Sequence, residues 1–66
     1  MTRNYKDYKI VVNEIDNPIY GKGYRAEFFV PKDNGMKDNI AVYEDYGHRL
    51  KPGDIIAFCQ KIIDLQ

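Results

Sequence analysis

The chain has 66 residues, 44% of them hydrophobic, and its ten basic and ten acidic residues give a formal net charge of zero. This length predicts one domain over residues 1–66, near the lower limit for folding without disulfides, metal or a partner. The balanced charge excludes a global field that would attract nucleic acid or an anionic membrane, and the single cysteine excludes an internal disulfide.

The hydropathy pattern argues against a membrane protein. No apolar stretch approaches the roughly 20 residues that span a membrane, and the first residues lack the hydrophobic stretch of a signal peptide. We therefore expect no membrane association and a location in a reducing cytoplasm, which for a phage-encoded protein is the cytoplasm of the host cell.

Four short runs of β-forming residues, separated by glycine and proline turns, occupy most of the chain. The first run, residues 8–15, is predicted to be a strand with apolar side chains on both faces. The turn-forming residues at 16–23 then place Ile19 and Tyr20 at an exposed tip. One face of the first strand carries Tyr8, Ile10 and Val12, and the other carries Val11 and Ile15.

The second run, residues 24–30, alternates most regularly and is the clearest predicted strand. Pro31 ends it, and the polar residues 32–39 are predicted to form a loop. The third run, residues 40–46, sets Ile40, Val42 and Tyr46 against Ala41 and Tyr43.

The last segment, residues 55–65, is the most apolar part of the chain and fits two structures. Its isoleucine-rich composition directly after Pro52 and Gly53, which suit a type II turn, favours a strand. A helix that begins after Asp54 is the alternative. The predicted fold is therefore all-β or β-rich, with a four- to five-stranded antiparallel sheet or barrel that a homodimer could complete.

Two segments carry a resemblance to a known family. Lys22-Gly23-Tyr24 opens an aromatic strand, and Leu50-Lys51-Pro52-Gly53-Asp54-Ile55-Ile56 enters the apolar segment. This arrangement of turns and strand starts resembles small OB-fold RNA-binding barrels of the cold-shock and TRAM kind over about half the chain. In the cold-shock pattern further aromatic residues follow, whereas this chain has Arg25 and Ala26 in those places. The resemblance implies base stacking by Tyr24, Phe28 and Phe29. An OB barrel needs a fifth strand, which a second copy or a bend at residues 13–14 would supply.

Few side chains are suited to catalysis or metal binding. Serine and tryptophan are absent, and the chain has one histidine, His48, and one cysteine, Cys59. One of each cannot complete a four-ligand zinc site within one copy, and no motif signals an oxyanion donor for a Cys-His nucleophile. We expect no enzyme activity, cofactor or metal, with His48 in an exposed turn and Cys59 in the core.

The six tyrosines are the feature that points to binding. A small core cannot provide hydrogen-bond partners for six buried hydroxyl groups, so several tyrosines must reach the surface. Exposed tyrosines anchor many protein interfaces, although they also pack across strands without binding anything. The leading hypothesis is a non-catalytic protein, homodimeric, that binds and masks a site on a host protein. In size and composition it resembles small phage inhibitors of the anti-CRISPR and other anti-defence kinds. The candidate partner-binding residues are Tyr20, Tyr24, Arg25, Glu27, Phe29, Tyr43 and Tyr46.

Two alternatives involve nucleic acid or nucleotides. The first is an OB-like module that binds single-stranded RNA or DNA through stacked aromatics and nearby cations. The second is a dimer that sequesters a small anionic nucleotide between its copies. Together the candidate contacts for these alternatives are Lys9, Lys22, Tyr24, Arg25, Phe28, Phe29, His48 and Arg49.

Overall fold

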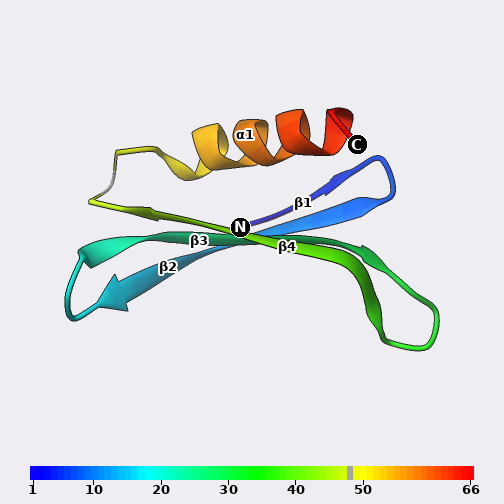
Figure 1. Ribbon diagram of the computed structural model, residues 1–66, viewed down its shortest axis with the longest axis horizontal. Helices are drawn as coiled ribbons and strands as arrows, with labels where there is room; N and C mark the ends of the chain where they lie inside the picture. The colour runs from blue at the N-terminus through cyan, green and yellow to red at the C-terminus, as the bar shows by residue number, and fades with distance from the viewer. Residues whose placement is uncertain (48) are drawn as a thin grey trace.

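The computed structural model of the protein describes residues 1–47 and 49–66 and has two layers. One layer is a four-stranded antiparallel sheet with the strand order β1-β2-β3-β4, and the other is a single helix that lies along one face of the sheet (Figure 1). This arrangement confirms the predicted β-rich class with an antiparallel sheet. The elements are β1 (Thr2–Tyr5), β2 (Tyr8–Asn17), β3 (Gly21–Pro31), β4 (Lys37–Tyr46) and α1 (Pro52–Asp64).

The two central strands, β2 and β3, form where the alternating patterns predict them. Ile10 pairs with Phe28 and Val12 pairs with Ala26, and all four side chains are buried beneath α1. Residues that are directly opposite across an antiparallel pair point to the same face of the sheet. The predicted division of each strand into two faces is therefore confirmed.

The connection between β2 and β3 is a tight turn. The side-chain oxygen Oδ1 of Asn17 accepts hydrogen bonds from the backbone N–H groups of Ile19 at 2.8 Å and Tyr20 at 3.0 Å. Gly21 follows with φ of +86°, a conformation that L-residues with side chains rarely adopt. Ile19 and Tyr20 are 81% and 67% exposed, which confirms the predicted exposed tip.

The helix α1 shows that the favoured strand over residues 55–65 was wrong and that the alternative was right. Pro52 occupies the first turn, where a missing N–H is harmless, and the Asp54 side chain accepts a hydrogen bond from the Lys51 N–H at 3.4 Å. The helical spacing of the apolar residues outweighs their β-branched composition, because a helix buries this stripe of side chains against the apolar face of the sheet. The buried positions of α1 are Ile55, Ile56, Cys59 and Ile63, which form one helical stripe.

The fourth strand of the sheet comes from the other end of the chain, where no strand was predicted. β1 is polar and short, so it carries no alternating signal, and it is held by pairing with β2. The Met1 ammonium group donates to the Val12 carbonyl at 2.8 Å, and the Val12 N–H donates to the Met1 carbonyl at 2.7 Å. The sheet does not close into a barrel, because α1 rather than a fifth strand covers its apolar face.

The connection from β4 to α1 is anchored by a buried carboxylate. Asp45 is 1% exposed, and its side chain accepts a hydrogen bond from the Leu50 N–H at 3.1 Å and lies 3.3 Å from the Arg49 guanidinium. At the opposite end of α1, Asp64 accepts from the Tyr5 hydroxyl at 2.9 Å and pairs with the Lys6 ammonium at 2.5 Å. These contacts fix both ends of α1 against the sheet.

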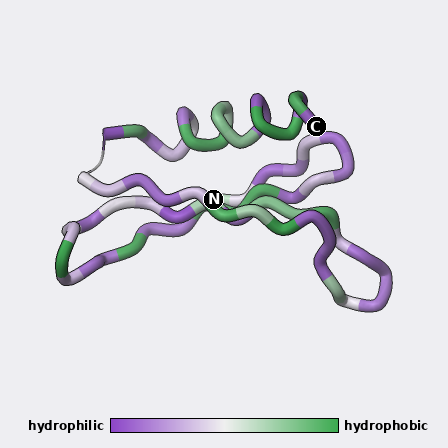
Figure 2. The backbone as a smooth tube through the Cα atoms, viewed as in Figure 1, coloured by the Kyte–Doolittle hydropathy of each residue, from purple (hydrophilic) through white to green (hydrophobic). Residues whose placement is uncertain are grey.

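The distribution of hydropathy follows the two layers. Apolar positions alternate with polar ones along α1, and the connection after β3 is mostly hydrophilic (Figure 2). That connection is shorter than the predicted loop, because β4 already begins at Lys37. In the described part of the chain, no helix has the length and apolarity needed to cross a membrane.

Candidate functional site

The face of the sheet opposite α1 is not covered by any element of the described chain, and we call it the open face. Since the even-numbered core residues of β2 and β3 face α1, alternation directs their odd-numbered neighbours to the open face. Odd-numbered residues of β3 pair with even-numbered residues of β4, so in β4 the even-numbered residues lie on the open face. The open face carries Lys9, Val11, Asn13, Arg25, Glu27, Phe29, Ile40, Val42, Glu44 and Tyr46.

Phe29 is the aromatic centre of the open face. Its side chain is only 6% exposed although no layer covers it. The Lys37 ammonium lies 4.5 Å from the centre of the Phe29 ring and 2.6 Å from the Glu27 carboxylate, so this ion pair shields the ring. An irregular register between Phe28 and Val30 accompanies this arrangement.

A shallow hollow of about 390 Å³ lies beside Phe29. Its charges are unbalanced, because three cations and one carboxylate line it. Lys37 forms an ion pair with this carboxylate, which belongs to Glu27. Lys9 and Arg25 have no ion-pair partner within residues 1–47 and 49–66. The hollow therefore presents two uncompensated positive charges beside apolar atoms. Its lining residues are Lys9, Val11, Asn13, Arg25, Glu27, Phe29 and Lys37.

Apolar side chains extend the open face toward β4. Ile40 and Val42 are 56% and 47% exposed, and Val42 is paired with Glu27 across the two strands. At the end of the sheet, the rings of Tyr20 and Tyr46 lie 5.3 Å apart. The Tyr46 hydroxyl donates a hydrogen bond to the Glu44 carboxylate, and this bond raises the pKa of Tyr46 above its usual value. The hydrogen bond to Glu44 and the ring contact with Tyr20 hold Tyr46 at this end of the open face.

The structure brings together five of the seven predicted partner-binding residues. Arg25, Glu27, Phe29 and Tyr46 share the open face, and Tyr20 joins them through its contact with Tyr46. Tyr24 and Tyr43 are not part of this group, because their strand positions direct them to the side of α1.

The residues predicted for nucleic acid or nucleotide binding are divided between the two faces. Lys9, Arg25 and Phe29 lie on the open face, and Phe28 is in the core at 2% exposure. Lys22 and Tyr24 occupy even-numbered positions of β3, on the side of α1, and Arg49 pairs with Asp45 on that side. His48 lies outside the described residues.

Six residues of the open face and its hollow were missed by sequence reasoning: Val11, Asn13, Lys37, Ile40, Val42 and Glu44. The alternating pattern placed three of them on a common side within their own strands, which was the available signal. That pattern does not reveal which side a helix will cover. Lys37 was assigned to a loop, since a polar strand end next to an irregular register has no periodic signal.

Cys59 lies in the core, away from the open face. Burial raises the pKa of the Cys59 thiol to about 11, so at neutral pH it is a protonated core group. No three potential metal ligands gather among the residues that the structure describes. No protein-family model, curated protein or solved structure matches the chain.

Proposed function

We propose that this protein is a non-catalytic interaction protein that masks a site on another protein with the open face of its sheet. The observation that carries the proposal is the hollow beside Phe29, where Lys9 and Arg25 have no ion-pair partner among the described residues and exposed apolar side chains continue along β4. An apolar centre with charged groups around it is the usual anatomy of a protein interface. An inhibitory role follows when the masked site is functional in the partner.

The chemistry of the open face defines the chemistry of the partner. Two uncompensated cations favour a partner that brings one or two carboxylates, and Val11, Ile40 and Val42 favour apolar side chains around them. Phe29 is already held in place by Lys37 and Glu27, so its ring needs little ordering on binding. We therefore expect an acidic and apolar patch on the partner, with an affinity that decreases as salt increases.

The proposal can be tested by affinity capture from a cell lysate with two charge-matched variants. The test variant is Lys9→Gln with Arg25→Gln, which removes both uncompensated cations of the hollow. The control is Arg3→Gln with Lys61→Gln, which removes two exposed cations outside the open face. Circular dichroism confirms that both variants fold, and quantitative mass spectrometry compares the retained proteins.

We expect wild type and control to retain the same protein and the test variant to lose it by at least about tenfold, as for two charge-assisted contacts. Equal retention by all three proteins would overturn the proposal. Retention of RNA or DNA in place of a protein, with steep salt dependence, would instead favour the nucleic-acid alternative.

A further inference from the structure

The outer edge of β4 is a long unpaired strand edge. β4 is the last strand in the sheet order, and within the described chain its only strand partner is β3. The Gly47 N–H donates to the Lys22 carbonyl at 2.8 Å, so odd-numbered residues at this end direct their backbone groups toward β3. By alternation, the backbone N–H and C=O groups of the even-numbered residues 40–46 point outward.

The beginning of this edge is protected against pairing. Lys37 and Asp38 are charged, and Asn39 has φ of +52° where the register with β3 shifts. Such charges and irregularities are common means of blocking an exposed strand edge. Residues 40–46 contain no proline and no lysine, and Glu44 is their only exposed charged side chain, so a seven-residue segment remains available for pairing.

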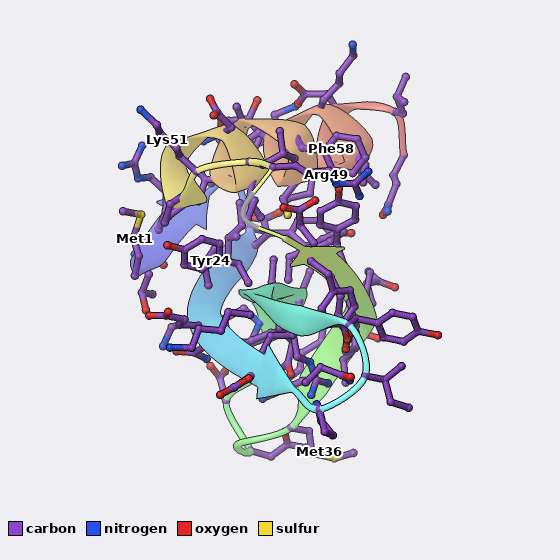
Figure 3. All side chains as sticks on the ribbon, turned by 90° about the vertical axis from the view of Figure 1, so that its left-hand side faces the viewer. Met1, Tyr24, Met36, Arg49, Lys51 and Phe58 are labelled. Carbon is purple, nitrogen blue, oxygen red and sulfur yellow. The ribbon has the colours of Figure 1, made fainter. Side chains whose placement is uncertain are left out.

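Exposed apolar side chains flank this free segment on both faces of the sheet. Ile40 and Val42 lie on the open face beside the edge. On the other face, Phe58 of α1 is 40% exposed and its ring lies 4.7 Å from the ring of Tyr43 (Figure 3 labels Phe58). An edge with apolar groups above and below it is complementary to a second edge of the same kind.

We propose that residues 40–46 pair with the same segment of a second copy, antiparallel, about a two-fold axis at Tyr43. In this register Ile40 pairs with Tyr46 and Val42 pairs with Glu44 of the other copy, and all of these residues present outward backbone groups. The two four-stranded sheets then become one continuous sheet. Tyr43 and Phe58 of both copies meet at the axis, on the side of the helices.

A second copy fits this edge better than an unrelated strand for two reasons. Tyr43 is the midpoint of residues 40–46, so a two-fold axis there pairs the outward backbone groups of one copy with those of the other and the assembly closes as a dimer. In addition, the molecule extends 36, 23 and 18 Å, and the view down its shortest axis shows the sheet edge-on (Figure 1). The strands run along the longest of these dimensions, so the open face of one copy is only four strands wide. Pairing through β4 joins two open faces into a larger one.

The dimer does not depend on the proposed function, since its interface is the edge of β4 rather than the hollow. The two associations also respond oppositely to salt. Glu44 of one copy lies diagonal to Glu44 of the other across the axis, so screening should strengthen the dimer, whereas screening should weaken contacts at Lys9 and Arg25.

The first test is the solution mass, measured by analytical ultracentrifugation over a range of concentrations. Val42→Pro removes an outward N–H without removing a hydrogen bond to β3, and proline is tolerated at such edge positions. Phe58→Lys independently places charges at the axis while keeping a good helix former in α1. Ile19→Lys is the matched control, because it replaces an exposed apolar residue at the turn between β2 and β3.

We expect wild type and Ile19→Lys to sediment at twice the 7.7 kDa chain mass. Both edge variants should dissociate with a dissociation constant at least about tenfold higher, since ladder hydrogen bonds or apolar contacts are lost. A wild type that stays monomeric at high concentration would overturn the proposal. A wild-type dimer that neither edge variant weakens would overturn it as well, because the interface would then lie elsewhere.

The second test is hydrogen exchange, which reports on single amides. Residues 41, 43 and 45 are paired with β3 in the monomer, whereas the amides at 42, 44 and 46 face outward. With increasing protein concentration we expect protection to increase at the even-numbered amides alone. Concentration-dependent protection that omits these amides, or that involves β1 instead, would contradict the β4 dimer.

Discussion

Gly23 has no room for a side chain, because the backbone of β4 lies directly against it. A Cβ atom at this position would lie 1.9 Å from the Asp45 carbonyl oxygen and 2.8 Å from the Tyr46 Cα, both of which belong to the backbone. We predict that Gly23→Ala lowers the free energy of unfolding by about 3 kcal/mol, the upper end of the range for overpacking. Gly53→Ala is the matched control.

At Gly53 a Cβ atom would have nothing within 4 Å, and the residue lies in the first turn of α1. Helix propensity predicts a gain of up to about 1 kcal/mol for Gly53→Ala. Denaturant unfolding of both variants measures the two effects. Equal stability changes at the two positions would show that the approach of β3 and β4 does not constrain Gly23.

The buried thiol of Cys59 should make the stability of the fold depend on pH above pH 9. Burial raises the pKa of the thiol from 9.0 to about 11, so the folded protein favours the protonated form. The resulting stabilisation is fully present below pH 9 and is lost as the pH rises through 11, by an amount on the order of 2 kcal/mol.

Comparison with Cys59→Ala isolates this contribution, because the raised pKa values of Tyr5 and Tyr46 act in the same direction in both proteins. Denaturant unfolding at a series of pH values between 8 and about 11 provides the measurement. The difference in stability between wild type and Cys59→Ala should shrink over this range. A constant difference would mean that the thiol is not buried in an apolar environment.

At the scale of single elements, α1 is held by one stripe of side chains. Ile55 is fully buried, whereas Leu65 immediately beyond α1 is 82% exposed. We predict that Ile55→Ala lowers the free energy of unfolding by about 2–4 kcal/mol and that Leu65→Ala changes it by less than about 0.5 kcal/mol. Thermal and chemical denaturation test this, and similar losses for both variants would contradict the packing of α1 described above.

The elements also show why some of the fold was predictable from sequence and some was not. The alternation in residues 24–30 reflects a local rule of strand geometry, and β3 follows it. The apolar positions of residues 55–65 are compatible with a strand or a helix. The helix is favoured by a tertiary contact, since its apolar stripe packs on Ile10 and Phe28. β1 is polar, and it depends on its pairing with β2, which no pattern in its own residues predicts.

The candidate site was predictable to a similar extent. Strand periodicity assigned Arg25, Glu27 and Phe29 to one side of β3, and the structure confirms that they share a face. Periodicity could not reveal which face of the sheet α1 would leave open, because that depends on how the layers pack. It also could not reveal that Lys37 returns over Phe29 after the connection between β3 and β4.

At the scale of the whole molecule, the two faces of the sheet have different surroundings, since α1 covers one face and leaves the other open. The face beneath α1 contains the core, including Ile10, Phe28 and Ile55. The open face is not needed to close that core, so it can carry Arg25 and Lys9, for which the described part of the chain offers no ion-pair partner. This division is the physical basis for the proposal that the open face binds a partner.

The most direct test of this account is a nuclear magnetic resonance titration of the isotope-labelled 66-residue chain with the protein retained in the capture experiment. The account predicts that the largest shift changes occur at Val11, Arg25, Glu27 and Phe29, and that they weaken with added salt. Shift changes confined to the exposed side of α1, with these four residues unaffected, would contradict it.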